Sequence, residues 1–285
     1  MSERVDWEAL PEELRTAVER RTGRVTSAVV VPEGLNCSLA LTLSTTAHGM
    51  LFLKGVRESD HAELAALRWE ESVNRTVRGI GPSIRHTFAA AGWRCLAFVH
   101  IEGRHADLGP GSRDLNAVAR TLRRIPALRV PDLPLPRFAD RYAEFLHPHE
   151  AAALHGRHLL HTDTNPHNIM IGRGGVAYII DWAMPATGPS WIDPAYTAVR
   201  LMECERSPEE AMAWLSGFPH WCTADRTAVE TFVDAECRRW TATVGEKGAA
   251  ASNARFRVLL DAAPAARPRP VARSAGGASV RRLFR

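Results

Sequence analysis

Residues 161–181 read HTDTNPHNIMIGRGGVAYIID. Two short runs of apolar and β-branched residues flank the glycine-rich sequence GRGG at 172–175, which predicts two antiparallel strands joined by a tight turn. Pairing outward from that turn places Asn168 near Ile179. It also brings Asn168 and Asp181 together at the open end of the hairpin, because paired strands lie only about 4.8 Å apart.

Two aspartates and one asparagine of this stretch have the chemistry of a phosphoryl-transfer site. Asn168 and Asp181 offer the amide and carboxylate oxygens that suit magnesium, which usually binds one or two carboxylates together with substrate phosphates. Asp163 lies five residues before Asn168 and is then free to act as a base. In the phosphoryl-transfer template an aspartate accepts the proton of the acceptor hydroxyl, while an asparagine and a second aspartate hold the metal. The spacing therefore predicts Asp163 as the catalytic base, with Asn168 and Asp181 as metal ligands.

The same residues resemble the kinase-like phosphotransferases of the aminoglycoside phosphotransferase and choline kinase group. HTD at 161–163, together with Asn168, is similar to the catalytic loop of that family, and IDW at 180–182 is similar to its metal-binding segment. WIDPAY at 191–196 looks like a later segment whose aspartate, Asp193 here, usually braces the catalytic loop. Followed more loosely, the resemblance extends from about residue 23 to about residue 239.

Three positions depart from the pattern of that family. Thr162 stands where glycine is usual, Ala183 stands where glycine or an acid is common, and Thr197 replaces a frequent aspartate. None of these changes removes a catalytic group. They concern the geometry of the catalytic loop and therefore the rate.

The resemblance implies an α+β, two-lobed protein-kinase-like fold. Residues 1–101 are expected to form an N-lobe with a small antiparallel sheet and a helix, and residues 102–263 a larger, mainly helical C-lobe. Residues 264–285 are expected to be a disordered basic tail. In the N-lobe the apolar runs predict strands over residues 25–31, 38–44, 50–56, 83–88 and 93–101, with the hinge between the lobes at residues 102–104.

Lysine is rare in this chain: the 36 lysines and arginines include only two lysines, Lys54 and Lys247. Lys54 lies in the apolar run MLFLKGV, where a buried charge needs a partner. In the protein-kinase template such a lysine contacts the nucleotide phosphates and is held by a glutamate of the next helix. The resemblance assigns that role to Glu63, with Glu70 as the second choice. The alternative is a lysine that reaches water along an edge strand.

The resemblance also implies where a nucleotide would bind. The loop at 32–36 is similar to the nucleotide-covering loop, with Asn36 at a matching place. Adenine would form hydrogen bonds with the backbone near Val99 and Ile101. The expected cofactors are ATP, with GTP as an alternative, and Mg²⁺.

Charge and cysteine content limit the other functions. The chain carries a net charge of +4, and residues 264–285 contain six arginines and no acids, which leaves −2 for residues 1–263. Residues 1–263 contain no basic helix of the kind that indicates nucleic-acid binding. No apolar stretch of the sequence approaches the length of a membrane span. Five cysteines without paired spacing favour reduced thiols and a cytoplasmic protein.

The leading hypothesis is an ATP-dependent phosphotransferase that phosphorylates a hydroxyl of a small molecule, such as an aminoglycoside-like antibiotic, with antibiotic resistance as the consequence. Acidic residues of the last helices would attract a polycationic acceptor, although acids on exposed helix faces are ordinary. Two alternatives stay open. One is a non-catalytic, kinase-like nucleotide-binding regulator, and the other is a kinase for a peptide or a natural-product intermediate. The sequence leaves the oligomeric state undetermined.

Overall fold

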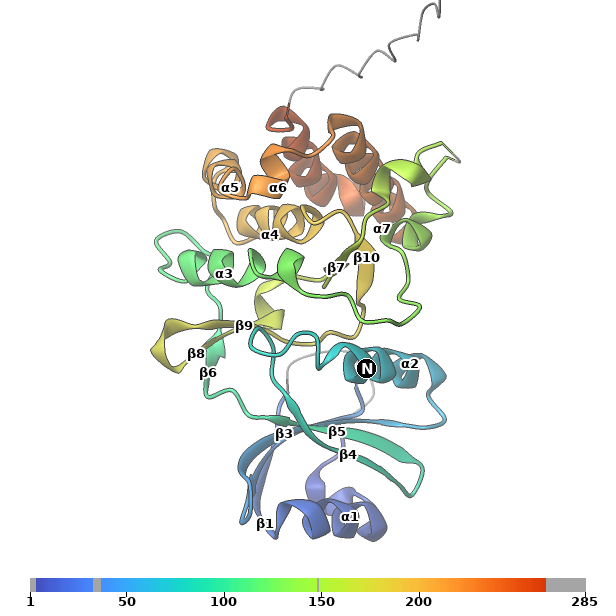
Figure 1. The fold of residues 1–285 in the computed structure, drawn as a ribbon, viewed down its shortest axis with the longest axis vertical. Coiled ribbons are helices and arrows are strands. Elements are labelled where there is room, and N and C mark those ends of the chain that lie inside the picture. Colours follow the sequence, from blue (N-terminus) through green and yellow to red (C-terminus); the bar gives the residue numbers. More distant parts are fainter. Residues whose placement is uncertain (1–3, 33–36, 148, 265–285) are drawn as a thin grey trace, which may run out of the picture.

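The computed structural model describes residues 4–32, 37–147 and 149–264, and the chain forms two lobes stacked along the long axis (Figure 1). Asn36 and the tail from residue 265 lie outside the described residues. The smaller lobe contains a five-stranded antiparallel sheet in the order β1-β2-β3-β5-β4. Its strands are β1 (Val25–Val30), β2 (Leu39–Thr45), β3 (Gly49–Arg57), β4 (Ile84–Ala90) and β5 (Trp93–Val99).

Two helices cover opposite faces of this sheet (Figure 1). Successive side chains of a strand point to opposite faces. Leu53 accordingly belongs to the apolar cluster under α1 (Glu12–Thr22), and Val56 belongs to the cluster under α2 (His61–Val73). Lys54 follows Leu53 directly, so it shares the α2 face, which is the face turned toward the larger lobe. The alternation of β3 thus places the lysine between the lobes.

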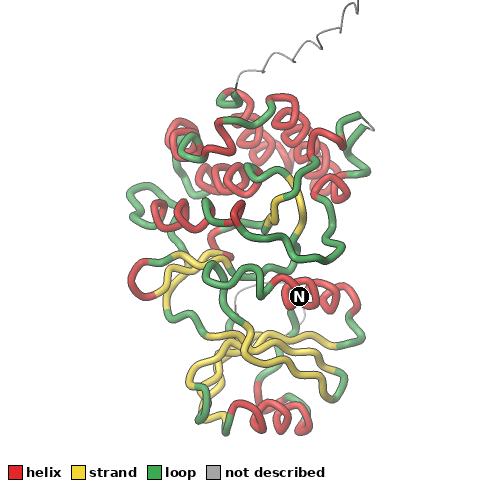
Figure 2. The backbone as a smooth tube through the Cα atoms, in the orientation of Figure 1, coloured by secondary structure: helices red, strands yellow, loops and turns green. Residues whose placement is uncertain are grey.

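The larger lobe is mainly helical, and Figure 2 shows its helices gathered at the end away from the five-stranded sheet. Its core is a single cluster of buried side chains that includes Phe138, Trp182 and Phe232. The expected helical content is confirmed, and the last helix bends at Gly245, where φ is 77°. The described helices are α3 (Leu115–Leu122), α4 (Ile192–Glu203), α5 (Pro208–Leu215), α6 (Pro219–Cys222) and α7 (Arg226–Asp261).

The hairpin predicted between residues 169 and 180 is present, as β8 (Ile169–Gly172) and β9 (Ala177–Ile179). Its register differs by one residue from the prediction, because Ile169, not Asn168, pairs with Ile179. The turn is one residue longer than predicted, and Gly174 and Gly175 within it both have positive φ. Asn168 lies opposite residue 180, whose N–H donates to its carbonyl at 2.9 Å, so the open end still brings it toward Asp181.

The expected hinge at residues 102–104 is tied to the hairpin. β6 (Gly103–His105) pairs with β8 and forms the three-stranded sheet β6-β8-β9. A Cβ atom at Gly103 would lie 2.1 Å from the carbonyl oxygen of Ile171. Glycine is therefore required where the connection between the lobes crosses the hairpin. A separate two-stranded sheet, of β7 (His158–Leu160) and β10 (Ala186–Gly188), supports the segment that precedes the loop of Asp163.

An ion pair fixes the start of the larger lobe to this connection. The Arg104 guanidinium donates to both carboxylate oxygens of Asp114, at 2.6 and 2.8 Å, and the N–H of Asp107 donates to the same carboxylate at 2.9 Å. The hydrogen bonds from Arg104 hold the pKa of Asp114 below its usual range.

Asp114→Asn is expected to lower thermal stability at neutral pH. A carboxyl whose pKa is lower in the folded state stabilises the fold above its unfolded pKa, about 3.9, and the contribution is lost as the pH falls through the folded value. The difference in melting temperature between wild type and variant should therefore be constant from pH 7 to 5 and shrink below about pH 4. Asp132→Asn, at an exposed position, is the control. A difference that persists unchanged to lower pH would contradict the assignment.

No helix among the described residues is long and apolar enough to cross a membrane. All five cysteines lie in the described part of the chain and are free thiols.

Candidate active site

Asp163 is held by two amide side chains from its own loop. Asn165 Nδ2 donates to Asp163 Oδ1 at 2.9 Å, and Asn168 Nδ2 donates to Asp163 Oδ2 at 2.9 Å. An ionised carboxylate only accepts hydrogen bonds, so both amides must present nitrogen to it. Asn168 Nδ2 also contacts the Asp163 carbonyl at 3.0 Å. The predicted base and the predicted metal ligand are therefore in direct contact.

The loop that carries Asp163 is braced from below by Asp193 of α4. The buried Asp193 carboxylate accepts from the N–H groups of His161 and Thr162, both at 2.8 Å. Burial raises the pKa of Asp193, partly offset by nearby His161 and by these two N–H groups. The His161 ring accepts the Asp163 N–H on Nδ1 at 3.2 Å, which leaves the hydrogen on Nε2 to donate to the Ile180 carbonyl at 2.9 Å. One histidine thus joins the loops of Asp163 and Asp181.

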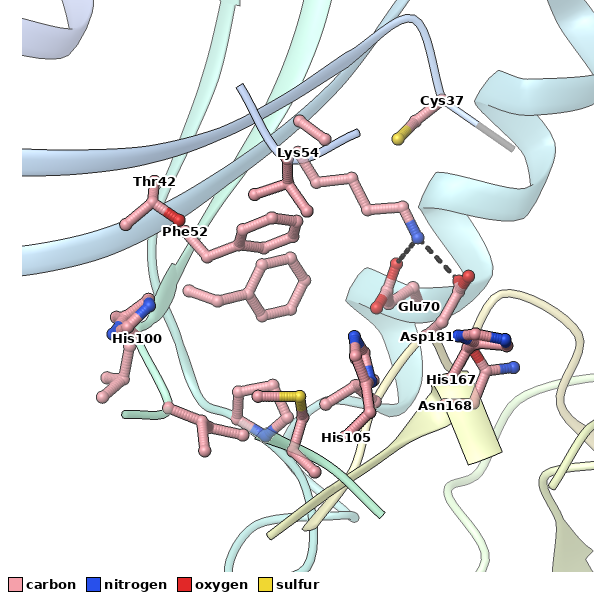
Figure 3. A pocket seen from close by; sticks show the side chains of 18 of the residues that line it. Cys37, Thr42, Phe52, Lys54, Glu70, His100, His105, His167, Asn168 and Asp181 are labelled. Atoms are coloured by element: carbon pink, nitrogen blue, oxygen red, sulfur yellow. Dashed lines mark hydrogen bonds and ion pairs between the residues drawn. The ribbon is translucent and has the colours of Figure 1, made fainter. Parts of the chain in front are cut away.

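Asn168 and Asp181 fit a magnesium ion. Because Asn168 Nδ2 is engaged by Asp163, its Oδ1 is directed elsewhere and is available as a ligand. Asp181 has one carboxylate oxygen on Lys54, and both Asn168 and Asp181 line the same pocket (Figure 3). Among the described residues no three His, Cys, Asp or Glu side chains form a metal cluster. A site with two protein oxygens, completed by phosphates and water, is the arrangement typical of magnesium rather than of zinc.

Lys54 pairs with Glu70, so the predicted pair with Glu63 is wrong. Lys54 Nζ lies 2.8 Å from Glu70 Oε2 and 2.6 Å from Asp181 Oδ1 (Figure 3). Glu63 instead accepts from Ser38 Oγ at 3.1 Å. Seven residues turn a helix through nearly two full turns, so both glutamates share one face of α2, about 10 Å apart along its axis. Asp60 caps the helix at its start, which puts Glu63 in the first turn and leaves Glu70 level with the lysine.

The pKa shifts of this cluster follow from burial and from the shared ammonium. Lys54 and Glu70 are only 6 % and 4 % exposed. Burial raises the pKa of Glu70, against the attraction of Lys54. For Asp181, burial is outweighed by the contact with Lys54, which lowers its pKa. The two carboxylates together raise the pKa of Lys54 despite its burial, so the ammonium is charged at all physiological pH values.

A pocket with a cavity volume of about 220 Å³ opens from this cluster between the two lobes. Its apolar end includes Phe52 and Phe98, whose ring centroids lie 6.4 Å apart. Its polar end is formed by Lys54, Asn168 and Asp181 (Figure 3). Val99 and Ile101, the predicted neighbours of adenine, also line it, together with residues that the sequence did not point to: Cys37, Thr42, His105 and His167.

The structure shows the surroundings of the three residues that depart from the family pattern. Thr162 takes the left-handed backbone conformation, with φ of 70°, which suits glycine and strains a β-branched residue. The buried Thr197 hydroxyl lies 2.8 Å from that of Thr164, which in turn donates to the Asp193 carbonyl at 3.2 Å. A hydroxyl thus replaces the frequent aspartate without leaving a buried group unpaired. Ala183 is buried beside these loops.

Comparison with known proteins shows similarity in part of the sequence and in the fold. Residues 155–230, which contain Asp163, Asn168, Asp181 and Asp193, match the phosphotransferase enzyme family. The chain has the fold of the kinase-like phosphotransferases. Choline kinase LicA from Streptococcus pneumoniae is similar with a TM-score of 0.56 and 15 % identity, over 86 % of this chain and 98 % of that chain.

Two further solved structures share this kinase-like fold. The AMP-bound spectinomycin phosphotransferase APH(9)-Ia is similar with a TM-score of 0.55 and 14 % identity, over 87 % of this chain and 93 % of that one. The GDP complex of an aminoglycoside 2'-phosphotransferase-IIIa mutant is similar with a TM-score of 0.54 and 14 % identity, over 86 % and 94 %. A comparison with curated protein sequences found no match. The resemblance inferred from the catalytic loop is confirmed, and at these identities the solved structures establish the fold.

Proposed function

We propose that the chain is a magnesium-dependent kinase that transfers the γ-phosphate of ATP, or of GTP, to a hydroxyl of a small molecule. The observation that carries this proposal is the hydrogen bond between the half-buried Asp163, the proposed base, and Asn168, the proposed metal ligand. The match of residues 155–230 to the phosphotransferase enzyme family supports it. So do the AMP and GDP complexes of the similar structures.

Each site residue then has a separate role. Asp163 orients the acceptor hydroxyl and takes its proton. Lys54, held by Glu70, contacts the nucleotide phosphates. Asn168 and Asp181 would hold a magnesium ion, which when bound would neutralise charge on the phosphates. Catalysis of this kind depends mostly on positioning and on fixed charges that complement the transferring group.

The nucleotide base would occupy the apolar end of the pocket. Phe52 and Phe98 line that end, and Val99 and Ile101 line the same pocket. The Val99 N–H already donates to the Ser83 carbonyl at 2.9 Å, so the main-chain contacts to a base would come from Ile101 and from the Val99 carbonyl. This arrangement supports recognition of a purine by stacking and by main-chain contacts. ATP and GTP differ in the donors and acceptors that they would present to that backbone, so direct binding measurements distinguish them.

The acids of the last helices do not by themselves favour a polycationic acceptor. Four of the described acids each pair with an arginine: Glu203, Glu210, Glu230 and Glu236. Paired acids attract a cation less than free acids do, because the partner cancels most of the field. An acceptor panel should therefore include aminoglycosides, choline-like alcohols and neutral hydroxylated antibiotics.

The function is tested by magnesium-dependent release of ADP from ATP, with and without each member of that panel. Stimulation by one compound, with phosphate recovered on its hydroxyl, would establish the kinase and its acceptor class. Saturable nucleotide binding without stimulation by any acceptor, and without hydrolysis of ATP, would favour the regulatory alternative over the proposed one.

Asp181→Ala is expected to weaken nucleotide binding in the presence of magnesium by about tenfold. The variant loses a metal ligand but also frees Lys54 from a competing carboxylate, so affinity measured in EDTA should not fall. Titration calorimetry with ATP, with and without magnesium, separates these two effects. Asp234→Ala, at an exposed position on α7, is the matched control. A wild-type affinity that is the same with and without magnesium would remove Asp181 from the role of metal ligand.

A further inference from the structure

Arg141 is a half-buried arginine, and the hydrogen-bond acceptors that it has among the described residues are all neutral. It lies on η3 (Phe138–Tyr142), a short helix anchored by the buried side chains of Phe138 and Tyr142. Its guanidinium donates to the Thr162 hydroxyl and to the carbonyl oxygens of Met184 and Pro185, the last at 3.1 Å.

These acceptors belong to the two loops that carry the predicted catalytic groups. Thr162 directly precedes Asp163, and Met184 follows Asp181 by three residues. The Thr162 hydroxyl also donates to the Met184 carbonyl, at 2.8 Å. Arg141 and Thr162 therefore link the loop of the base to the loop of the metal ligand.

The link has little value for stability alone. Burial lowers the pKa of Arg141, partly offset by Tyr196, Tyr142 and Asp193, because a guanidinium bound only to neutral oxygens is poorly compensated for lost hydration. Thr162 adds backbone strain at φ of 70°. Both features are unfavourable for folding, so a role in positioning the site residues explains them better than a role in stability.

Hydrogen bonds hold both the backbone and the side chain of Thr162. Its N–H donates to Asp193, its hydroxyl oxygen accepts from Arg141, and its hydroxyl hydrogen points to Met184. The next residue, Asp163, can then vary little in position relative to the Asp181 loop.

We infer that Arg141 and Thr162 act as a pair of positioning residues, which set the distance between the base Asp163 and the metal ligand Asp181. The inference deepens the proposed kinase function and rests on it. Neither residue needs to touch the substrate for this role.

The test uses steady-state hydrolysis of ATP in the presence of magnesium, with water as the phosphate acceptor. Thr162→Ala and Arg141→Met should each lower kcat by about tenfold, with the KM for ATP close to the wild-type value. Thr162→Ser retains the hydroxyl and should retain most of kcat. The double variant should be no slower than the slower single variant, because the two residues act through one link.

Arg137→Met, on the residue before η3, is the matched control, since Arg137 pairs with Asp140 at the surface. Kcat values equal to wild type in the two single variants would overturn the inference while leaving the kinase function intact. Equal losses in Thr162→Ser and Thr162→Ala would overturn it as well, and so would losses that multiply in the double variant. A wild-type chain that neither hydrolyses ATP nor transfers phosphate would refute the proposed function, and the inference with it.

Discussion

Asp163→Asn is expected to reduce phosphoryl transfer by about a thousandfold, within the range that a positioned general base contributes. The hydrogen bonds of the loop to Asp193 are unaffected, so the loop should keep its shape. Asparagine is nearly the same size as aspartate, and its single amide oxygen can still accept from Asn168 Nδ2, whereas its NH2 group cannot accept from Asn165. What it lacks is the ability to take the proton of the acceptor hydroxyl. Nucleotide affinity should not change, because Asp163 does not line the pocket in which the nucleotide is proposed to bind.

The measurement is the rate of ADP release with the best acceptor of the panel, beside calorimetric binding of ATP. Asp234→Asn on α7 makes the same chemical change at an exposed position and should leave both quantities unchanged. Transfer near the wild-type rate in Asp163→Asn would show that another group is the base. A loss of nucleotide binding equal to the loss of rate would show that the substitution had disturbed the pocket rather than the chemistry.

The part of this site that the sequence predicted is local. Asp163, Asn168 and Asp181 lie within 19 residues, on a loop and a hairpin whose turn is specified by glycines. Short-range geometry sufficed to bring them together, and a register error of one residue did not separate them. The apolar run around Lys54 likewise predicted a lysine that needs a charged partner, and the buried Lys54 has two.

The parts that could not be predicted depend on contacts between distant segments. The choice between Glu63 and Glu70 required the position of α2 along its own axis, because both residues share one face of that helix. The contact of Arg141 with Thr162 joins residues 21 positions apart, across a segment with little regular periodicity. Thr162 belongs to the HTD motif, but that motif does not point to Arg141, which lies in no recognised motif.

Lys54→Met is expected to destabilise the fold by about 3–5 kcal/mol, the usual loss when one partner of a buried ion pair is removed. The variant would leave Glu70 and Asp181 without the ammonium that lies 2.8 and 2.6 Å from them. Nucleotide affinity should fall as well, since the phosphates lose their buried cation. Chemical denaturation and ATP titration measure the two effects separately.

The pKa of Glu70 determines how the stability of Lys54→Met should depend on pH. Burial already raises the pKa of Glu70 in the wild type, and loss of Lys54 removes the interaction that opposes this rise. A carboxyl whose pKa is raised by folding contributes stability below its unfolded pKa, about 4.3, and this contribution is lost as the pH rises through the folded value. The stability of Lys54→Met should therefore fall more steeply than that of wild type between pH 5 and 8.

A second substitution distinguishes the two candidate glutamates. If the instability of Lys54→Met comes from the orphaned Glu70 carboxylate, adding Glu70→Gln should recover part of the lost stability and flatten the pH dependence, because a neutral amide is cheaper to bury than a charge. Adding Glu63→Gln, the same change seven residues earlier on the same helix, should recover nothing. If Glu63→Gln restored stability instead, Glu63 would be the ion-pair partner of Lys54. If neither substitution restored stability, Lys54 would stabilise the fold through Asp181 alone.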